Sequence, residues 1–202
     1  MNPTKTLPAT HTLAWAVDMK KDRRLHWMLQ LAGLVWFFVA GFLVLKMVAV
    51  LRPDFALQGE FHDVWEVLLW GLAALLIIFV TVTVHELVHG FFFWIFTKAR
   101  PQFGIGPGYA YAAAPDWYFP KGQYLVIGLA PLVVLTVLGL FAIALAPMAW
   151  IPALFMAVIF NAGGAIGDIY VCLRIGLEAP NICVKDTGDG FEVYRVGIDR
   201  RP

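Results

Sequence analysis

Two histidines and a glutamate lie close together in the string His85-Glu86-Leu87-Val88-His89. On a helix, residues at i and i+4 share one face about one turn apart, so both imidazoles can reach a single divalent metal ion. Glu86 then lies beside that ion. A carboxylate there can take a proton from zinc-bound water, whose pKa falls far below that of bulk water, to about 7. The string predicts a zinc site with an adjacent catalytic base.

The residues on either side of this string are apolar. Residues 81–84 and 91–96 offer few polar partners, and ionisable groups in such surroundings are costly unless they bind something or line a wet cavity. Two other interpretations remain open. One is a solvated helix face, and the other is a polar cluster whose hydrogen bonds are satisfied by a neighbouring helix. The apolar flanks favour a metal site.

The composition predicts a membrane protein. The chain has 202 residues, of which 60% are hydrophobic and 14% charged, and its mean hydropathy is +0.74. These values lie outside the range of soluble proteins. The net charge is +1, and no run of basic residues suggests a groove for phosphates, so a nucleic-acid partner is not expected.

Four apolar segments are long enough to cross a bilayer as helices, which takes about 20 residues each. They cover residues 25–51, 64–97, 124–146 and 148–175. The second is too long for a simple span, so we expect it to tilt or to project beyond the bilayer. The predicted fold is therefore an all-α integral membrane protein with about four transmembrane helices.

Lysine and arginine near the ends of these segments predict the orientation. Basic residues gather before the first span, in the loop after the second and at the start of the tail, which predicts that both termini are cytoplasmic. The expected organisation is a cytoplasmic segment over residues 1–24, a four-helix metallopeptidase domain over 25–175 and a cytoplasmic tail over 176–202.

A catalytic zinc usually has three protein ligands, so the two histidines need a third. Asp168 is the only acidic residue in the fourth span, and it lies seven residues before Ile175, while His89 lies eight before Thr97. At about 1.5 Å per residue, the two side chains are at nearly equal depth. Asp168 is therefore the candidate third ligand. The alternative is that Asp168 binds no metal and simply faces the membrane interface at the end of its helix.

Asn161 lies seven residues before Asp168 and on nearly the same helix face. Its amide can donate to a developing oxyanion, or it can form an interhelical hydrogen bond; we keep both roles. The glycines 163, 164 and 167 are expected to let this helix approach the second span closely.

The histidine string in one span, with Asn161 and Asp168 in a later one, resembles the intramembrane zinc metalloproteases of the site-2 protease type. The small size, the His-Glu-Leu-Val-His-Gly string and Gly-Asp-Ile-Tyr at 167–170 resemble more closely a bacterial family of membrane zincin peptidases. The likeness covers roughly residues 64–174. It implies His85, His89 and Asp168 as zinc ligands and Glu86 as the catalytic acid and base.

The loop over residues 98–122 mixes aromatic residues with glycine and proline, which predicts a re-entrant or interfacial hairpin between the second and third spans. By resemblance to site-2 proteases, such a hairpin pairs with an unwound substrate segment. The alternative is an aromatic belt that anchors the loop among lipid headgroups. Residues 182–196 read as a small C-terminal β-hairpin with a glycine-rich turn.

These observations predict an intramembrane zinc metalloprotease, with one zinc ion per chain, that hydrolyses a peptide bond in or near a transmembrane segment. The expected partners are a membrane-protein or peptide substrate and the lipid bilayer, and the expected location is the bacterial cytoplasmic membrane. The alternative is a catalytically inactive metal-binding membrane protein that serves as a structural or binding partner. A metal transporter ranks third, since it would need more polar residues along the spans. The oligomeric state is left open.

Overall fold

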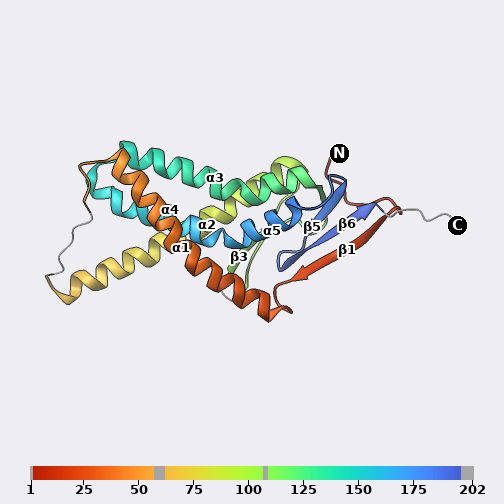
Figure 1. The fold of residues 1–202 in the computed structure, drawn as a ribbon, viewed down its shortest axis with the longest axis horizontal. Helices are drawn as coiled ribbons and strands as arrows, with labels where there is room; N and C mark the ends of the chain where they lie inside the picture. Colours follow the sequence, from red (N-terminus) through yellow and green to blue (C-terminus); the bar gives the residue numbers. More distant parts are fainter. Residues whose placement is uncertain (1, 57–61, 107–108, 197–202) are drawn as a thin grey trace. The chain divides into compact units, whose positions relative to one another are not determined.

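Long apolar helices dominate the structure, a computed structural model that describes residues 2–56, 62–106 and 109–196. Helix α1 covers Arg23–Leu51, α2 covers Val64–Thr97 and α3 covers Lys121–Leu145 (Figure 1). Each is long and apolar enough to cross a membrane. Helix α2 has the predicted bounds. Its 34 residues extend over about 51 Å, well beyond a hydrocarbon core of about 30 Å.

The fourth apolar segment is a broken helix, whereas the sequence predicted one continuous span. A 3₁₀ turn, η1, covers Met148–Trp150, α4 covers Ile151–Gly164 and α5 covers Ile166–Gly176. The two helical parts are bent by 42° at Ala165, whose N–H is shared between the carbonyls of Asn161 and Ala162. Glycines on both sides weaken the helix there. The described chain thus has three helices long and apolar enough to cross a membrane, or four if the bent pair counts as one span.

The described residues group into two compact units. The first, which we call the sheet unit, comprises the chain up to Gln30, Glu86–Ala130 and the chain from Gly167 onward. The second, the helical unit, comprises Leu31–His85 and Pro131–Ile166. The division between them falls within the continuous helices α1, α2 and α3 and after the first residue of α5.

A four-stranded antiparallel sheet forms the core of the sheet unit (Figure 1). Its strands, in the order β1-β6-β5-β4, cover His11–Asp18, Gly190–Val196, Ile182–Asp186 and Tyr118–Pro120. The C-terminal hairpin β5–β6 confirms the prediction, whereas β1 and β4 were not predicted. The sheet therefore joins the N-terminal segment, the loop between α2 and α3, and the tail. Phe119, Val184 and Val193 are fully buried in its core.

The aromatic-rich loop after α2 contains a second, two-stranded sheet. Strands β2, Gln102–Gly106, and β3, Tyr109–Ala113, pair antiparallel; Pro107 and Gly108 lie outside the described residues. A Cβ atom on Gly90 would come within 2.5 Å of the Phe103 ring, so β2 packs against α2 directly after His89. The place of this hairpin relative to the bilayer stays a prediction.

In the helical unit, α1, α3 and α4 pack around Val48, Ile143 and Ile151, all fully buried. Glycines permit close contacts here, but not those expected. Gly163 packs against Phe37 of α1, while a Cβ on Gly164 or Gly167 would meet nothing within 4 Å. The expectation that these three glycines bring the fourth segment against the second span was therefore wrong.

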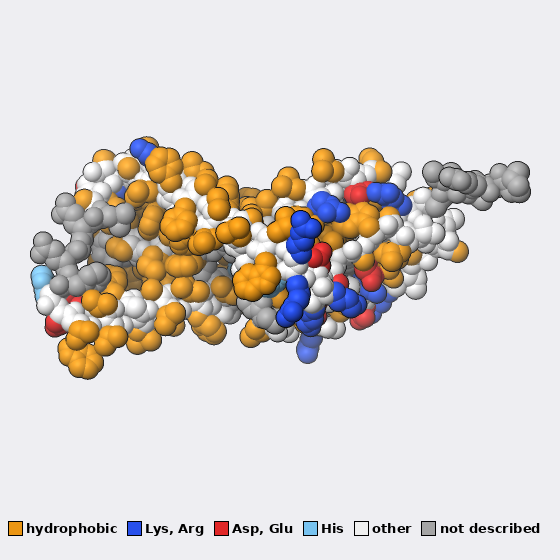
Figure 2. Space-filling view, turned by 60° about the horizontal axis from the view of Figure 1, so that its bottom comes forward, with side chains coloured by type: hydrophobic (Ala, Val, Ile, Leu, Met, Phe, Trp, Pro, Cys, Tyr) orange, Lys and Arg blue, Asp and Glu red, His pale blue; other side chains and the backbone are white. Residues whose placement is uncertain are grey.

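The long helices and the four-stranded sheet differ in the side chains that they expose. Hydrophobic side chains cover the long helices, while most lysine, arginine, aspartate and glutamate side chains in this view gather where the sheet lies (Figure 2). Large apolar residues on α1, α2 and α3 are exposed, among them Phe38, Leu69, Phe79 and Phe141. Soluble proteins rarely expose contiguous apolar surface of this kind. The helices thus indicate a multi-pass membrane protein; the division into residues 1–24, 25–175 and 176–202 stays a prediction.

Candidate metal centre

The two histidines of the predicted site lie on one buried face of α2. His85 and His89 are each 7% exposed. Glu86, which follows His85 directly in the sequence, is partly buried. The division between the two units falls between His85 and Glu86, but α2 is continuous across it. The position of His85 relative to His89 is therefore set by a single turn of helix.

Asp168 supplies a carboxylate to the same place. It lies in the first turn of α5, and its Oδ1 is 3.4 Å from Nε2 of His89. One ligand atom from each of His85, His89 and Asp168 lies within 4.8 Å of the others. The structure thus brings together the three residues that the sequence analysis proposed as ligands.

A close contact between α3 and α5 positions Asp168. Cys172 follows Asp168 by four residues and so shares its helix face. A Cβ atom on Gly128 would come 2.5 Å from Sγ of Cys172, so only glycine leaves room for this contact without a shift. The face of α5 that carries Asp168 is therefore held against α3 within the sheet unit.

A proline in α3 accounts for the orientation of His89. Nδ1 of His89 donates to the carbonyl oxygen of Ile127 at 2.9 Å, an interaction that assigns Nε2 as the ligand nitrogen. In an unbroken helix, the Ile127 carbonyl would accept the N–H of residue 131. That residue is Pro131, which has no N–H. The carbonyl is therefore left to accept from the histidine.

Asn161 of α4 orients the other histidine. Its Oδ1 lies 2.9 Å from Nδ1 of His85, and its Nδ2 donates to the carbonyl oxygen of Pro131 at 3.3 Å. The amide is 2% exposed. The interhelical hydrogen bond, one of the two roles considered for Asn161, is thus formed. The other role, a hydrogen bond from the Asn161 amide to a developing oxyanion, stays a prediction.

The donor set fits zinc. Two imidazole nitrogens and one carboxylate oxygen make a His₂–carboxylate set, which leaves a fourth position for water or substrate. For a tetrahedral ion with ligands at about 2.0–2.2 Å, neighbouring ligand atoms are about 3.4 Å apart. The separation of Nε2 in His89 from Oδ1 in Asp168 is 3.4 Å. Each histidine also has the outer hydrogen bond that orients metal-bound imidazoles.

A partly buried carboxylate of the tail, Asp186, lies next to the helix turn that orients His89. The hydroxyl of Tyr124, one turn before Ile127 in α3, donates to Oδ2 of Asp186 at 2.7 Å. The backbone N–H of Gly188 donates to Oδ1 of Asp186 at 2.8 Å, which closes the expected turn. Burial raises the pKa of Asp186 to about 6. The tail is thus hydrogen-bonded to α3 close to the candidate metal site.

Sequence reasoning missed Ile127, Pro131, Tyr124 and Asp186. Only Pro131 gave a local signal, because a proline inside an apolar span leaves the carbonyl four residues earlier without its helical partner. The roles of Tyr124 and Asp186 depend on how the tail folds against α3. Such pairing is not visible in either segment alone.

The helices and the donor set together indicate a membrane protein with a candidate metal site on a helix long and apolar enough to span a membrane. A comparison with family models agrees: the model described as "Putative zincin peptidase" matches residues 78–184. The chain belongs to this family. The match includes His85, Glu86, His89, Asn161 and Asp168. No curated protein matched the chain, nor did any solved structure.

Proposed function

We propose that the protein is an intramembrane zinc metalloprotease, which hydrolyses a peptide bond in or near a transmembrane segment of a membrane-protein substrate. The observation that carries this proposal is the convergence of His85, His89 and Asp168 within 4.8 Å beside Glu86, on helices apolar enough to span a membrane. Membership of the zincin peptidase family supports the peptidase part.

Glu86 has the central chemical role in this proposal. A bound zinc ion supplies Lewis-acid polarisation of the scissile carbonyl and makes water more acidic. The Glu86 carboxylate takes the proton of the attacking water and returns it to the leaving amine nitrogen. His85 and His89 are held by Asn161 and Ile127, so their ligand nitrogens need not reorganise.

The sheet supports a four-span topology. Strand β1 precedes α1, β4 lies between α2 and α3, and β5 follows α5, yet all three belong to one sheet. They must then lie on one side of the membrane, which requires an even number of crossings, with α4 and α5 together making one. With the excess of basic residues near these segments, we place both termini and the sheet on the cytoplasmic side of a bacterial membrane.

Glu86→Gln separates a protease from an inactive metal-binding protein. Purified wild type and Glu86→Gln would be compared for zinc content and for cleavage of single-span substrates in proteoliposomes. The variant should keep its zinc, because Glu86 is not a ligand, and lose at least about 100-fold in turnover, because the amide cannot accept a proton.

Glu66→Gln, the same change in the first turn of α2, is the matched control and should retain activity. Full activity of Glu86→Gln would exclude the assigned mechanism. A zinc-loaded wild type that cleaves no member of a broad substrate panel would instead favour the inactive metal-binding protein.

A further inference from the structure

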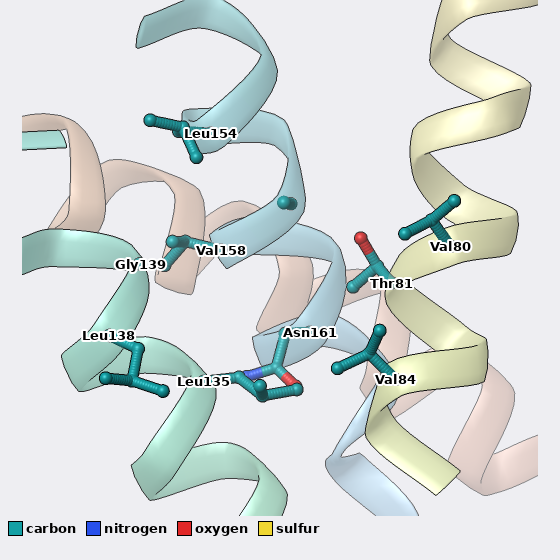
Figure 3. Close-up of a pocket in the computed structure, with 10 residues that line it drawn as sticks. Val80, Thr81, Val84, Leu135, Leu138, Gly139, Leu154, Val158 and Asn161 are labelled. Atoms are coloured by element: carbon teal, nitrogen blue, oxygen red, sulfur yellow. The ribbon is translucent and has the colours of Figure 1, made fainter. Parts of the chain in front are cut away.

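An apolar cavity opens in the helical unit beside His85. Its volume is about 270 Å³, and α2, α3 and α4 line it (Figure 3). The walls are mainly aliphatic, with Val84, Leu138, Leu154 and Ala157 among them. The lining residues with polar side chains are Thr81 and Asn161, and Figure 3 shows the Asn161 amide at one end of the group of side chains.

The cavity is linked to one of the candidate metal ligands, His85, through a residue that lines it. Asn161 lines the cavity, and its Oδ1 is hydrogen-bonded to His85. Thr81 lies four residues before His85 on the same face of α2. An occupant of the cavity is therefore about one helical turn, about 5.4 Å, from a metal ligand.

We propose that the cavity binds one large apolar side chain of the substrate and so determines cleavage specificity; this inference rests on the proposed protease function. An extended peptide advances about 3.3 Å per residue. The side chain bound here would then belong to a residue about two positions from the bond that is cleaved.

The size of the cavity favours a single side chain. An apolar cavity of about 150 Å³ is large enough to bind benzene, so 270 Å³ accommodates the side chain of leucine, methionine or phenylalanine. The aliphatic walls offer little to a charged group, whose burial there would be costly. The preferred substrate residue is therefore large and apolar.

The test fills the cavity and measures the size preference of cleavage. Wild type and Ala157→Leu would cleave a panel of single-span substrates in proteoliposomes, with Ala, Leu or Phe at each of three positions on both sides of the bond. Wild type should prefer Leu or Phe at one position. Ala157→Leu should lower kcat/KM for those substrates by about 10- to 100-fold, while kcat/KM for the Ala substrate changes little.

Two further variants complete the comparison. Ala153→Leu makes the same change one turn earlier on α4, outside the cavity lining, and should leave the preference unchanged. Leu138→Ala enlarges the cavity and should shift the preference toward Phe. This second change also covers the case in which Ala157→Leu fails to fold.

The outcomes separate this inference from the proposed function. Cleavage by wild type with the same size preference in Ala157→Leu and Leu138→Ala would overturn the inference alone. A lipid that copurifies with wild type, is lost in Ala157→Leu and leaves the preference unchanged would assign the cavity to an acyl chain instead. Absence of any cleavage by zinc-loaded wild type would remove the proposed function, and this inference with it.

Discussion

The carbonyl oxygen of Ile127 lies 2.9 Å from Nδ1 of His89, and it is left to accept this hydrogen bond because the residue four positions later is Pro131. A structural defect of one helix thus orients a candidate metal ligand of another. At the other histidine, Oδ1 of Asn161 accepts a hydrogen bond from Nδ1 of His85. Nδ2 of Asn161 in turn donates to the carbonyl oxygen of Pro131. One proline is therefore next to both outer hydrogen bonds of the site.

Replacement of this proline should change stability and metal binding in opposite directions. In Pro131→Ala, the new N–H can donate to the Ile127 carbonyl and compete with His89. The helix gains stability, by up to about 3 kcal/mol, while zinc affinity should fall about 10- to 100-fold. Thermal unfolding and competition with a zinc chelator measure the two effects.

Pro152→Ala is the matched control. This proline lies in the first turn of α4, where a backbone N–H has no helical partner in any case. Zinc affinity should stay as in wild type. If Pro131→Ala bound zinc as tightly as this control, the orienting role of the Ile127 carbonyl would be excluded.

The metal ligands should each be necessary for zinc binding. Wild type should bind one zinc ion per chain, and His85→Ala, His89→Ala and Asp168→Ala should each lose it at micromolar free zinc, because each removes one of three protein ligands. Elemental analysis of the purified protein measures the content. His62→Ala, a change at an exposed histidine, is the control. Zinc retained in Asp168→Ala alone would transfer the third ligand to another residue and leave the histidine pair intact.

The local parts of this site could be predicted from the sequence, and the long-range parts could not. The spacing of His85 and His89 fixes their common face through helix geometry, and the depth of Asp168 in its span suggests the pairing that the structure has. By contrast, the break at Ala165 depends on weak helix-forming glycines inside an apolar run. The sheet depends on pairing between segments more than a hundred residues apart, such as β1 with β6. No single segment encodes that pairing.

Two substitutions of Asn161 distinguish its possible roles. Asn161→Leu removes the acceptor for Nδ1 of His85, so zinc affinity should fall about 10- to 100-fold, with a loss of about 1–3 kcal/mol in stability. Asn161→Asp keeps an acceptor and should retain zinc. The measurements are chelator competition and turnover at saturating zinc. Unchanged zinc affinity in Asn161→Leu, together with a loss of turnover in both variants, would support the oxyanion role instead.

The stability of the protein should depend on pH through Asp186. Burial raises the pKa of this carboxyl from 3.8 to about 6, so the folded protein binds more protons than the unfolded chain between these values. Its contribution to stability is therefore largest at low pH and is lost as the pH rises through about 6. Between pH 5 and 7, wild type should lose roughly 1 to 1.5 kcal/mol relative to Asp186→Asn, which does not titrate.

Unfolding of metal-free protein from pH 5 to 8 measures this difference, and Asp189→Asn is the control of opposite sign. The hydrogen bond from Lys20 holds the pKa of Asp189 below its usual value. The ionised Asp189 carboxylate therefore stabilises the fold at pH values above the usual aspartate pKa, and this stabilisation is lost only as the pH falls through the lowered pKa. The difference in unfolding free energy between wild type and Asp189→Asn should thus stay constant from pH 5 to 8. An equally constant difference for Asp186→Asn would show that the Asp186 carboxyl does not titrate near pH 6. The tail would then be held to Tyr124 by an ordinary ionised aspartate.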